Sequence, residues 1–477
     1  MRKRKIDDAR GCVQQEAMKM DCSTGEILNE RGVSRRDFLK FCSALVIVGA
    51  GLPVASARAQ YLYPKYRGQT VVISVPAHPH YDAMVKLLPE FTQETGVKVE
   101  VDRRQILPMK VKQLQEMAKP QGEFDLICYV VMWKGEYVKK NMIHELTPFL
   151  ADATLADPAY DIEDIVPCYL ENIGLVGGPR GYLAGAGAKL YGIPYGAETS
   201  ILAYRHDIFT KHKLQPPETY DELQKLLYIL RDKEGIGALT SRGKVGHQGV
   251  HAWLLHLNPL GGKVFDAQWA PTFNNDAGVK ALTLLKEIVD TGPAGILNFG
   301  AIEMQNSFLQ GQSAMYLDNT GIFGPVKNAD VSKIDGKVSY ALHPKGLRYA
   351  SQSGGLGLAI PLNAKNANAG FLLMQWLTSK TQDKAISRLG GSPCRQSTIQ
   401  DPDMVRQFPE YVMLREQLKY SDPDWRPIIA EWDDINVNVL GVAVNEALTG
   451  KKSPDQALND MMPKAIEIMK SGGYLKG

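Results

Sequence analysis

Apolar residues between positions 69 and 143 alternate between two spacings. The runs at 69–76, 97–103 and 124–131 are rich in β-branched residues or alternate strictly, which is typical of strands. Between them, Met84, Leu87, Leu88 and Phe91 recur at helical spacing before a glycine stop, and 109–119 and 134–143 are also helical in pattern. This β-α-β-α-β order predicts a parallel sheet with helices on its faces, in which ligands bind where strands end and loops leave for helices.

The later chain continues the alternation with clear punctuation. Residues 189–230 indicate strand, turn, strand, short helix, a Pro-Pro break and a helix in which Thr219 and Glu222 have capping-box spacing. Residues 354–390 indicate a strand, a turn and a strongly amphipathic helix whose Trp376 we assign to the core. The glycine-rich stretch 174–188 predicts a surface loop or hairpin. It lacks the G-x-G-x-x-G and G-K-[ST] patterns of nucleotide-binding loops.

The sequence VSRRDFLKF at 33–41 precedes a run without charge that extends from 41 to 57. The serine, paired arginines and following Phe-Leu-Lys match the twin-arginine export motif. Small residues then suit cleavage after Ala59, so we predict a signal peptide over 1–59, passage through the twin-arginine translocase and a periplasmic location. The alternative is an ordinary anchor helix with a chance basic flank. No lipobox precedes Cys42, which argues against a lipid anchor.

Composition narrows the class of partner. Residues 1–59 hold 11 Lys and Arg but 7 Asp and Glu, and the remaining chain has one more acidic than basic residue. A near-neutral chain without a basic stripe argues against nucleic-acid binding. Three cysteines remain after cleavage, Cys128, Cys168 and Cys394, so at most one disulfide can form. They form no cluster for a redox cofactor, and we predict no cofactor and no metal.

Six segments, in order, resemble the solute-binding proteins of ABC importers, in the carbohydrate-binding family that includes maltose-binding protein. They are FTQETGVKVEV, FDLICYVVMWKGEYVKKNMIHELTPFL, LYGIPYGAETSILAYRHDIF with PPETYDEL, FLQGQSAMYLDNTG, GGLGLAIP and ALTGKKSPDQAL. The resemblance covers nearly the whole chain after the signal. It implies an α/β fold of two lobes around a ligand cleft, with a hinge that closes over the ligand.

The lobe boundaries follow from breaks in the strand–helix alternation at YGAETSILAYR and MYLDNTGIFG. We expect a first lobe from 60–197 plus 325–380 and a second from 198–324 plus 381–477. A chain of this length is too long for one core, which independently favours two lobes. We expect a monomer.

The resemblance places ligand-binding groups of the first lobe in two strand-end loops. His78 lies where relatives often have an acidic or polar hydroxyl binder, with His80 and Tyr81 beside it. The alternative for His78 is a solvated turn, and two histidines without an acidic or thiol partner are poor evidence for metal. Tyr129 and Trp133 are the candidate aromatic platforms, and the alternative for Trp133 is burial under the next helix.

Other candidates lie at the crossing and in the second lobe. Glu198 matches a carboxylate that accepts ligand hydroxyls in the family; a salt bridge between lobes is the alternative. Gly354 and Gly355 either let the backbone approach the ligand or serve a tight turn. Relatives often carry a tryptophan where Gly321 or Ile322 stands here, which removes one platform. The remaining candidates follow strands or open a helix: Gln248, His251, Asp318, Asn319 and, as a late platform, Trp432.

These observations predict a periplasmic receptor that delivers a carbohydrate-like solute, namely a sugar, a polyol or a glycerol phosphate derivative, to an inner-membrane ABC permease. No chemistry is required, because binding selects the closed state. One alternative is a secreted carbohydrate-acting enzyme with paired carboxylates, although no G-x-S-x-G or H-E-x-x-H motif occurs. Another is a receptor for a metal or oxyanion on the same fold. Turnover of a bound sugar and the metal content of the purified protein discriminate between them.

Overall fold

Most strands of the protein join one mixed sheet, and a two-stranded hairpin stands apart from it. A computed structural model describes residues 64–476. The main sheet has the order β2-β1-β3-β10-β6-β8-β7, with β9 beside β6 and β11 beside β10, and the hairpin is β4-β5. The strands are β1 (Thr70–Pro76), β2 (Lys98–Arg104), β3 (Leu126–Val130), β4 (Leu175–Val176), β5 (Lys189–Leu190), β6 (Ile193–Arg205), β7 (Gly237–Thr240), β8 (Ser313–Asn319), β9 (Val338–Ala341), β10 (Ser351–Ala359) and β11 (Ser421–Asp422).

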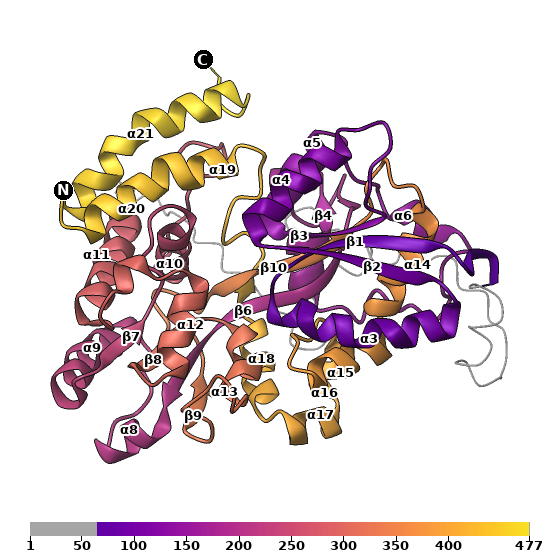
Figure 1. Ribbon diagram of the computed structural model, residues 1–477. Coiled ribbons are helices and arrows are strands. Elements are labelled where there is room, and N and C mark those ends of the chain that lie inside the picture. Colours follow the sequence, from indigo (N-terminus) through magenta and orange to yellow (C-terminus); the bar gives the residue numbers. More distant parts are fainter. Residues whose placement is uncertain (1–63, 477) are drawn as a thin grey trace, which may run out of the picture. The chain divides into compact units, whose positions relative to one another are not determined.

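Helices connect these strands and make up the C-terminal part of the chain (Figure 1). The α-helices are α3 (Pro79–Thr95), α4 (Ile106–Met117), α5 (Lys134–Lys139), α6 (Thr147–Ala151), α7 (Pro167–Tyr169), α8 (His206–Lys211), α9 (Tyr220–Glu234), α10 (His247–Leu257), α11 (Asp276–Thr291), α12 (Ala301–Leu309), α13 (Phe323–Val326), α14 (Ala367–Leu377), α15 (Lys380–Arg388), α16 (Gln396–Gln400), α17 (Pro402–Gln407), α18 (Glu410–Leu418), α19 (Trp432–Asp434), α20 (Gly441–Leu448) and α21 (Pro454–Ser471). Short 3₁₀ or π segments are η1 (Pro64–Tyr66), η2 (Val131–Trp133), η3 (Leu170–Gly174), η4 (Pro179–Gly181), η5 (Ile296–Asn298), η6 (Thr320–Ile322) and η7 (Ile435–Leu440).

The first three strands form the predicted parallel unit. β1 pairs in parallel with both β2 and β3, and Figure 1 shows α4 and α5 on one face of these strands and α3 on the other. Helix α3 ends because Gly96 adopts a left-handed conformation, with φ of 71°, and returns a backbone bond to Thr92. The parallel β-α-β-α-β order predicted from the apolar spacing is therefore confirmed.

Strand β6 changes partners along its length. Its first half, up to Thr199, pairs with β10, and its second half pairs with β8 from Ser200 onward. β8 in turn pairs in parallel with β7, so the carboxyl ends of β7 and β8 meet at one edge of the sheet. Glu198 stands at this change of partners, next to the end of β8.

Local details of the later chain are confirmed with one exception. Thr219 and Glu222 form the predicted capping box at the start of α9, and the 174–188 stretch contains β4 and connects it to β5 in the β4-β5 hairpin. Trp376 is in the core, as expected. The prediction of a strongly amphipathic helix was wrong, because α14 is buried along its length from Ala369 to Leu377.

Two further expectations concern cysteines and the chain start. The side chains of Cys128, Cys168 and Cys394 are all buried, and no disulfide joins any two of them. The signal peptide predicted for residues 1–59 lies outside the described residues. Within 64–476, no helix combines the length and apolar character needed to cross a bilayer.

Candidate ligand-binding site

Charged and polar side chains gather where β7 and β8 end. Because these parallel strands end at one edge, residues that follow them are brought together with the first turns of α10. We call this group the Asp318 cluster; it consists of Glu198, Arg242, Gln248, His251, Asp318 and Asn319.

A buried ion pair is at the centre of the Asp318 cluster. The Arg242 guanidinium binds both carboxylate oxygens of Asp318, with Nε–Oδ2 and Nη2–Oδ1 distances of 2.8 and 2.5 Å. Asp318 also accepts hydrogen bonds from the backbone and side-chain nitrogens of Asn319. Burial acts to raise the pKa of Asp318, but Arg242 outweighs it and holds that pKa well below its usual range. Asp318 therefore stays ionised at neutral pH.

Two residues of α10, Gln248 and His251, lie next to the Arg242–Asp318 ion pair. Gln248 accepts a hydrogen bond from Arg242 Nη1 at 3.2 Å. His251 Nε2 lies 3.6 Å from Asp318 Oδ1. Burial, aided by the charge of Arg242, lowers the pKa of His251 to about 4, so its imidazole is neutral at pH 7. A neutral imidazole can either donate or accept a hydrogen bond from a solute hydroxyl.

Glu198 faces the cluster from β6. Burial raises the pKa of Glu198 to about 7, although Arg242 opposes the shift. Its Oε1 lies 2.9 Å from the position that a Cβ on Gly321 would occupy, and Asn319 Oδ1 lies 2.7 Å from the same point. The chain therefore has no room for a side chain at 321 with these two groups in place.

The segment after β11 brings an indole and a second guanidinium to the cluster. Trp425 Nε1 donates to the Ser353 carbonyl at 2.5 Å, and the Trp425 and His251 ring centroids are 5.4 Å apart. The Arg426 guanidinium carbon lies 4.7 Å from the centroid of the Trp425 ring. Arg426 Nη2 lies 3.7 Å from the point that a Cβ on Gly354 would occupy.

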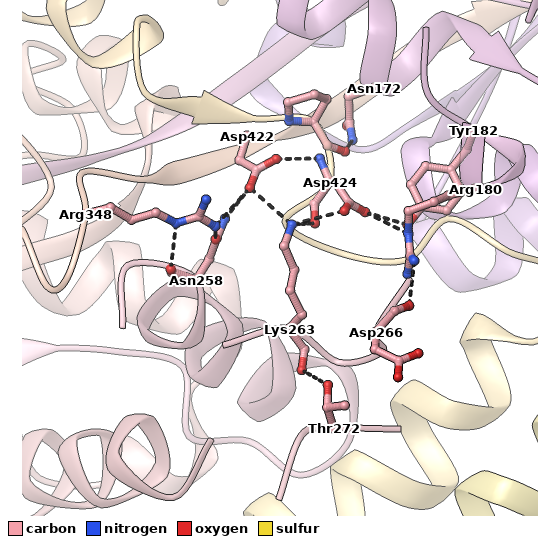
Figure 2. A network of polar contacts seen from close by, with 11 residues as sticks. Asn172, Arg180, Tyr182, Asn258, Lys263, Asp266, Thr272, Arg348, Asp422 and Asp424 are labelled. Carbon is pink, nitrogen blue, oxygen red and sulfur yellow. Dashed lines mark hydrogen bonds and ion pairs between the residues drawn. The ribbon is translucent and has the colours of Figure 1, made fainter. Parts of the chain in front are cut away.

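A polar network holds this segment in place (Figure 2). Figure 2 shows Lys263 between Asp422 and Asp424, with Nζ–Oδ2 distances of 3.4 and 3.0 Å. On its other side Asp424 accepts a hydrogen bond from the Tyr182 hydroxyl at 2.7 Å, and Arg180 lies beside it. Both aspartates are thus fixed from two directions, which fixes the backbone that carries Trp425 and Arg426.

The structure brings five sequence-predicted site residues together: Glu198, Gln248, His251, Asp318 and Asn319. Two other predicted site residues, Gly355 and Trp432, are not part of the Asp318 cluster. Gly355 has φ of 104° at a bulge between β6 and β10, and a Cβ there would lie 2.5 Å from the Gly196 carbonyl oxygen. Its glycine is required by the neighbouring strand. Trp432 is fully buried, and its Nε1 has no hydrogen-bond partner among the described residues.

The three predicted residues after β1 form an aromatic contact under β6. His78 caps α3 by accepting a hydrogen bond from the backbone nitrogen of His80, so it is a cap and not only a solvated turn. His80 and Tyr81 are buried against Tyr195, with ring centroids 4.4 and 5.7 Å from it. The Tyr81 hydroxyl donates to the Tyr195 carbonyl at 3.1 Å. Among residues 64–476, no hydrogen bond, ion pair or ring contact joins these rings to the Asp318 cluster.

The two predicted platforms after β3 are also packed inside. Tyr129 is fully buried and its hydroxyl donates to the Ile173 carbonyl at 2.6 Å. Trp133 is buried beside Tyr137 of α5, with ring centroids 6.3 Å apart. The structure thus favours the alternative of burial under the next helix for Trp133. The ligand roles of Tyr129 and Trp133 stay predictions.

Sequence reasoning missed Arg242, Trp425 and Arg426. A signal for the last two was present in DPDWRP at 422–427, where an aromatic and a cation are adjacent between prolines. The sequence-based prediction named Trp432 instead, which lies six residues after Arg426. Arg242 follows a short strand whose position at the site is set by its parallel pairing with β8, and the local pattern does not show that pairing.

The donor set does not suit a metal ion. Within residues 64–476, no group of three or more His, Cys, Asp or Glu side chains is arranged to hold one. In the Asp318 cluster the Asp318 carboxylate is already paired with the Arg242 guanidinium. The cluster can offer hydrogen-bond donors and acceptors, an indole and positive charge to an organic solute.

Known proteins match this chain over most of its length. Residues 77–384 match the bacterial extracellular solute-binding protein family. The chain is 27% identical to a probable amino-acid ABC transporter periplasmic-binding protein of Sinorhizobium fredii, over 93% of this chain and 100% of that protein. It is 26% identical to a mannitol-binding protein of Pseudomonas aeruginosa, over 76% of this chain and 84% of that protein.

Solved structures agree with the fold. A solute-binding protein of an ABC transporter from Agrobacterium radiobacter, crystallised with ribitol, has a TM-score of 0.76 and 26% identity, over 84% of this chain and 99% of that one. The mixed α/β sheet is therefore that of the periplasmic binding proteins, and the family is one of transport receptors and not of enzymes. Since the match covers well over half of its residues, the chain belongs to the bacterial extracellular solute-binding protein family.

Proposed function

We propose that the protein is the periplasmic receptor of an ABC importer and holds a polyol or small sugar at the Asp318 cluster. The observation that carries the proposal is the buried Arg242–Asp318 pair, with Glu198, Gln248 and His251 around it. These groups offer both donors and acceptors at strand ends, which is what hydroxyl recognition requires. Relatives named for mannitol and erythritol, and one structure that contains ribitol, support the solute class.

Movement between two lobes would couple binding to transport. The change of partners along β6 at Thr199 and Ser200 supports a crossing at this point, with lobes of 60–197 plus 325–380 and 198–324 plus 381–477. A solute that contacts both sides favours the closed state by its differential affinity, and the permease responds to closure. Export by the twin-arginine translocase would place the receptor in the periplasm. We expect the receptor to be a monomer there. Cell fractionation of a chain with Arg35 and Arg36 both changed to lysine tests that route.

A calorimetric screen tests the binding role. The purified protein, expressed as the full chain, is titrated with ribitol, mannitol, erythritol, glucose and maltose. We expect one solute to bind and to raise the melting temperature. At a hundredfold excess over its Kd, the bound solute should add about 2.7 kcal/mol to the free energy of unfolding. Glu198→Ala should weaken that binding, whereas Glu416→Ala, at an exposed pair with Lys419 on α18, should not. Equal affinity in both variants would contradict the site.

The screen also covers solutes other than polyols and sugars, namely amino acids and inorganic ions. Amino acids are included because the relative from Sinorhizobium fredii is named for them. Inorganic phosphate and divalent metals are included to test the alternative of an oxyanion or metal receptor. Absence of binding in every arm would contradict the receptor role itself.

A further inference from the structure

Arg426 differs from the other buried arginines in its partners. Within residues 64–476, three arginines are at most 6% exposed: Arg242 at 6%, Arg395 at 1% and Arg426 at 4%. Arg242 pairs with Asp318, and Arg395 lies 3.3 Å from Asp164 while donating to two backbone carbonyls. Among residues 64–476, Arg426 has no ion pair or hydrogen bond, and its Nε is buried without a partner.

The surroundings of Arg426 do not neutralise its charge. Burial, together with repulsion from Arg242, lowers the pKa of Arg426 to about 10, so it remains protonated at pH 7. The carboxylate of Asp433 acts on Arg426 from a distance but is paired with Lys110. His247 and His251 are neutral, because burial lowers both of their pKa values. An uncompensated buried charge is costly, so a retained one indicates a partner outside the chain.

The fold holds Arg426 at this position. Lys263 and Tyr182 fix the aspartates that precede it, as Figure 2 shows, and the Trp425 ring supports one face of its guanidinium. The nearby Gly354 has no side chain to cover the Nη2 end of that guanidinium. Two further buried atoms of the same region, Asn436 Oδ1 and His251 Nε2, also lack hydrogen-bond partners within the described chain.

We propose that the solute carries a carboxylate, which pairs with the Arg426 guanidinium. The inference rests on the proposed receptor role and adds to it that the solute bears an acidic group. A guanidinium matches a carboxylate geometrically by two parallel hydrogen bonds. One free guanidinium balances a single negative charge, whereas a phosphate monoester carries close to two and Arg242 is already occupied by Asp318. The carboxylate belongs to either a polyhydroxy acid or an amino acid.

Matched acid and neutral solutes test this with the unmodified protein. Calorimetry compares ribonate with ribitol, mannonate with mannitol and glucuronate with glucose, and adds the amino acids and ribitol 5-phosphate. We expect one carboxylate to bind about 100-fold more tightly than its neutral counterpart. Tight binding of ribonate, mannonate or glucuronate identifies the solute as a polyhydroxy acid. Binding of an amino acid alone identifies the solute as an amino acid.

Variants of Arg426 attribute the preference to this residue. Arg426→Met should remove most of the hundredfold preference and, without solute, should maintain or raise the melting temperature, since it removes an unpaired buried charge. Arg426→Lys should retain part of the preference. Arg231→Met is the control, because Arg231 is an exposed residue paired with Asp232 on α9, and it should change neither quantity.

The outcomes separate this inference from the proposed function. Equal or tighter binding of the neutral polyol, or an acid preference that survives in Arg426→Met, overturns the carboxylate and leaves the receptor role intact. Binding of the phosphate ester alone also overturns it. Absence of binding in every arm overturns the receptor role and the inference together.

Discussion

The loops after β1 and β3 and the Asp318 cluster both hold residues that the sequence nominates for ligand binding, and they differ in how their polar groups are paired. In the first region the Tyr81 and Tyr129 hydroxyls donate to backbone carbonyls, whereas His80 Nε2 is buried without a hydrogen-bond partner among the described residues. Around the second, His251 Nε2 and Arg426 Nε are buried without hydrogen-bond partners within the described chain. An aromatic residue near a strand end is therefore weak evidence for a platform, because packing accounts for it equally well.

The two regions also differ in how charge is distributed. Next to the rings after β1 and β3, Lys110 Nζ lies 5.5 Å from the centroid of the Trp133 ring, whereas the cluster brings four ionisable groups close together, namely Asp318, Arg242, Glu198 and Arg426. Charges in such a space shift one another's pKa values and mark candidate functional sites. Substitutions in the two regions should consequently change different quantities: stability in the first, and both stability and solute affinity in the second.

The largest expected effect is the loss of the buried ion pair. Asp318→Ala leaves the Arg242 guanidinium buried without a carboxylate, which should cost about 3–5 kcal/mol of the free energy of unfolding. Urea denaturation at pH 7 measures it. Asp290→Ala is the control, since Asp290 pairs with Lys286 on the exposed face of α11 and should cost less than about 1 kcal/mol. Similar small losses in both variants would show that the cluster is solvated.

A smaller effect should depend on pH through Glu198. Its pKa is raised to about 7 in the fold, above about 4.3 for an unfolded chain. The folded state therefore binds the proton more tightly, and the stability from this group is lost as the pH rises from about 4 to 7. Arg242 and Asp318 face the carboxyl, as do the phenols of Tyr169 and Tyr316.

Glu198→Gln should remove this dependence. We expect the variant to be more stable than the unmodified protein by about 1–3 kcal/mol at pH 8, with the difference shrinking toward pH 4. Urea denaturation across that range checks the sign, and Glu416→Gln on the surface of α18 should show no such trend. A difference that grows toward acid pH would mean that Glu198 is ionised and paired in the fold.

The sequence predicted the fold better than the site because the two depend on different information. The helix stop at Gly96 and the capping box at Thr219 are local, and both are confirmed. The meeting of Arg242 with Asp318 depends on the parallel pairing of β7 with β8. The position of Arg426 depends on β11 joining β10 across about seventy residues of chain. Local periodicity does not encode such pairings, so the sequence nominated five residues that the structure brings together in the Asp318 cluster but neither Arg242 nor Arg426.

The smallest expected effect sharpens the contrast from the side of the first region. Tyr129→Phe removes one buried hydroxyl and leaves the Ile173 carbonyl without its donor, which should cost about 1 kcal/mol of unfolding free energy. Solute affinity, measured by calorimetry on the same samples, should not change. Tyr228→Phe, at an exposed ring on α9, is the control and should change neither quantity. A tenfold loss of affinity in Tyr129→Phe without loss of stability would contradict this contrast. It would mean that the Tyr129 hydroxyl binds the solute, which would place the site at the end of β3.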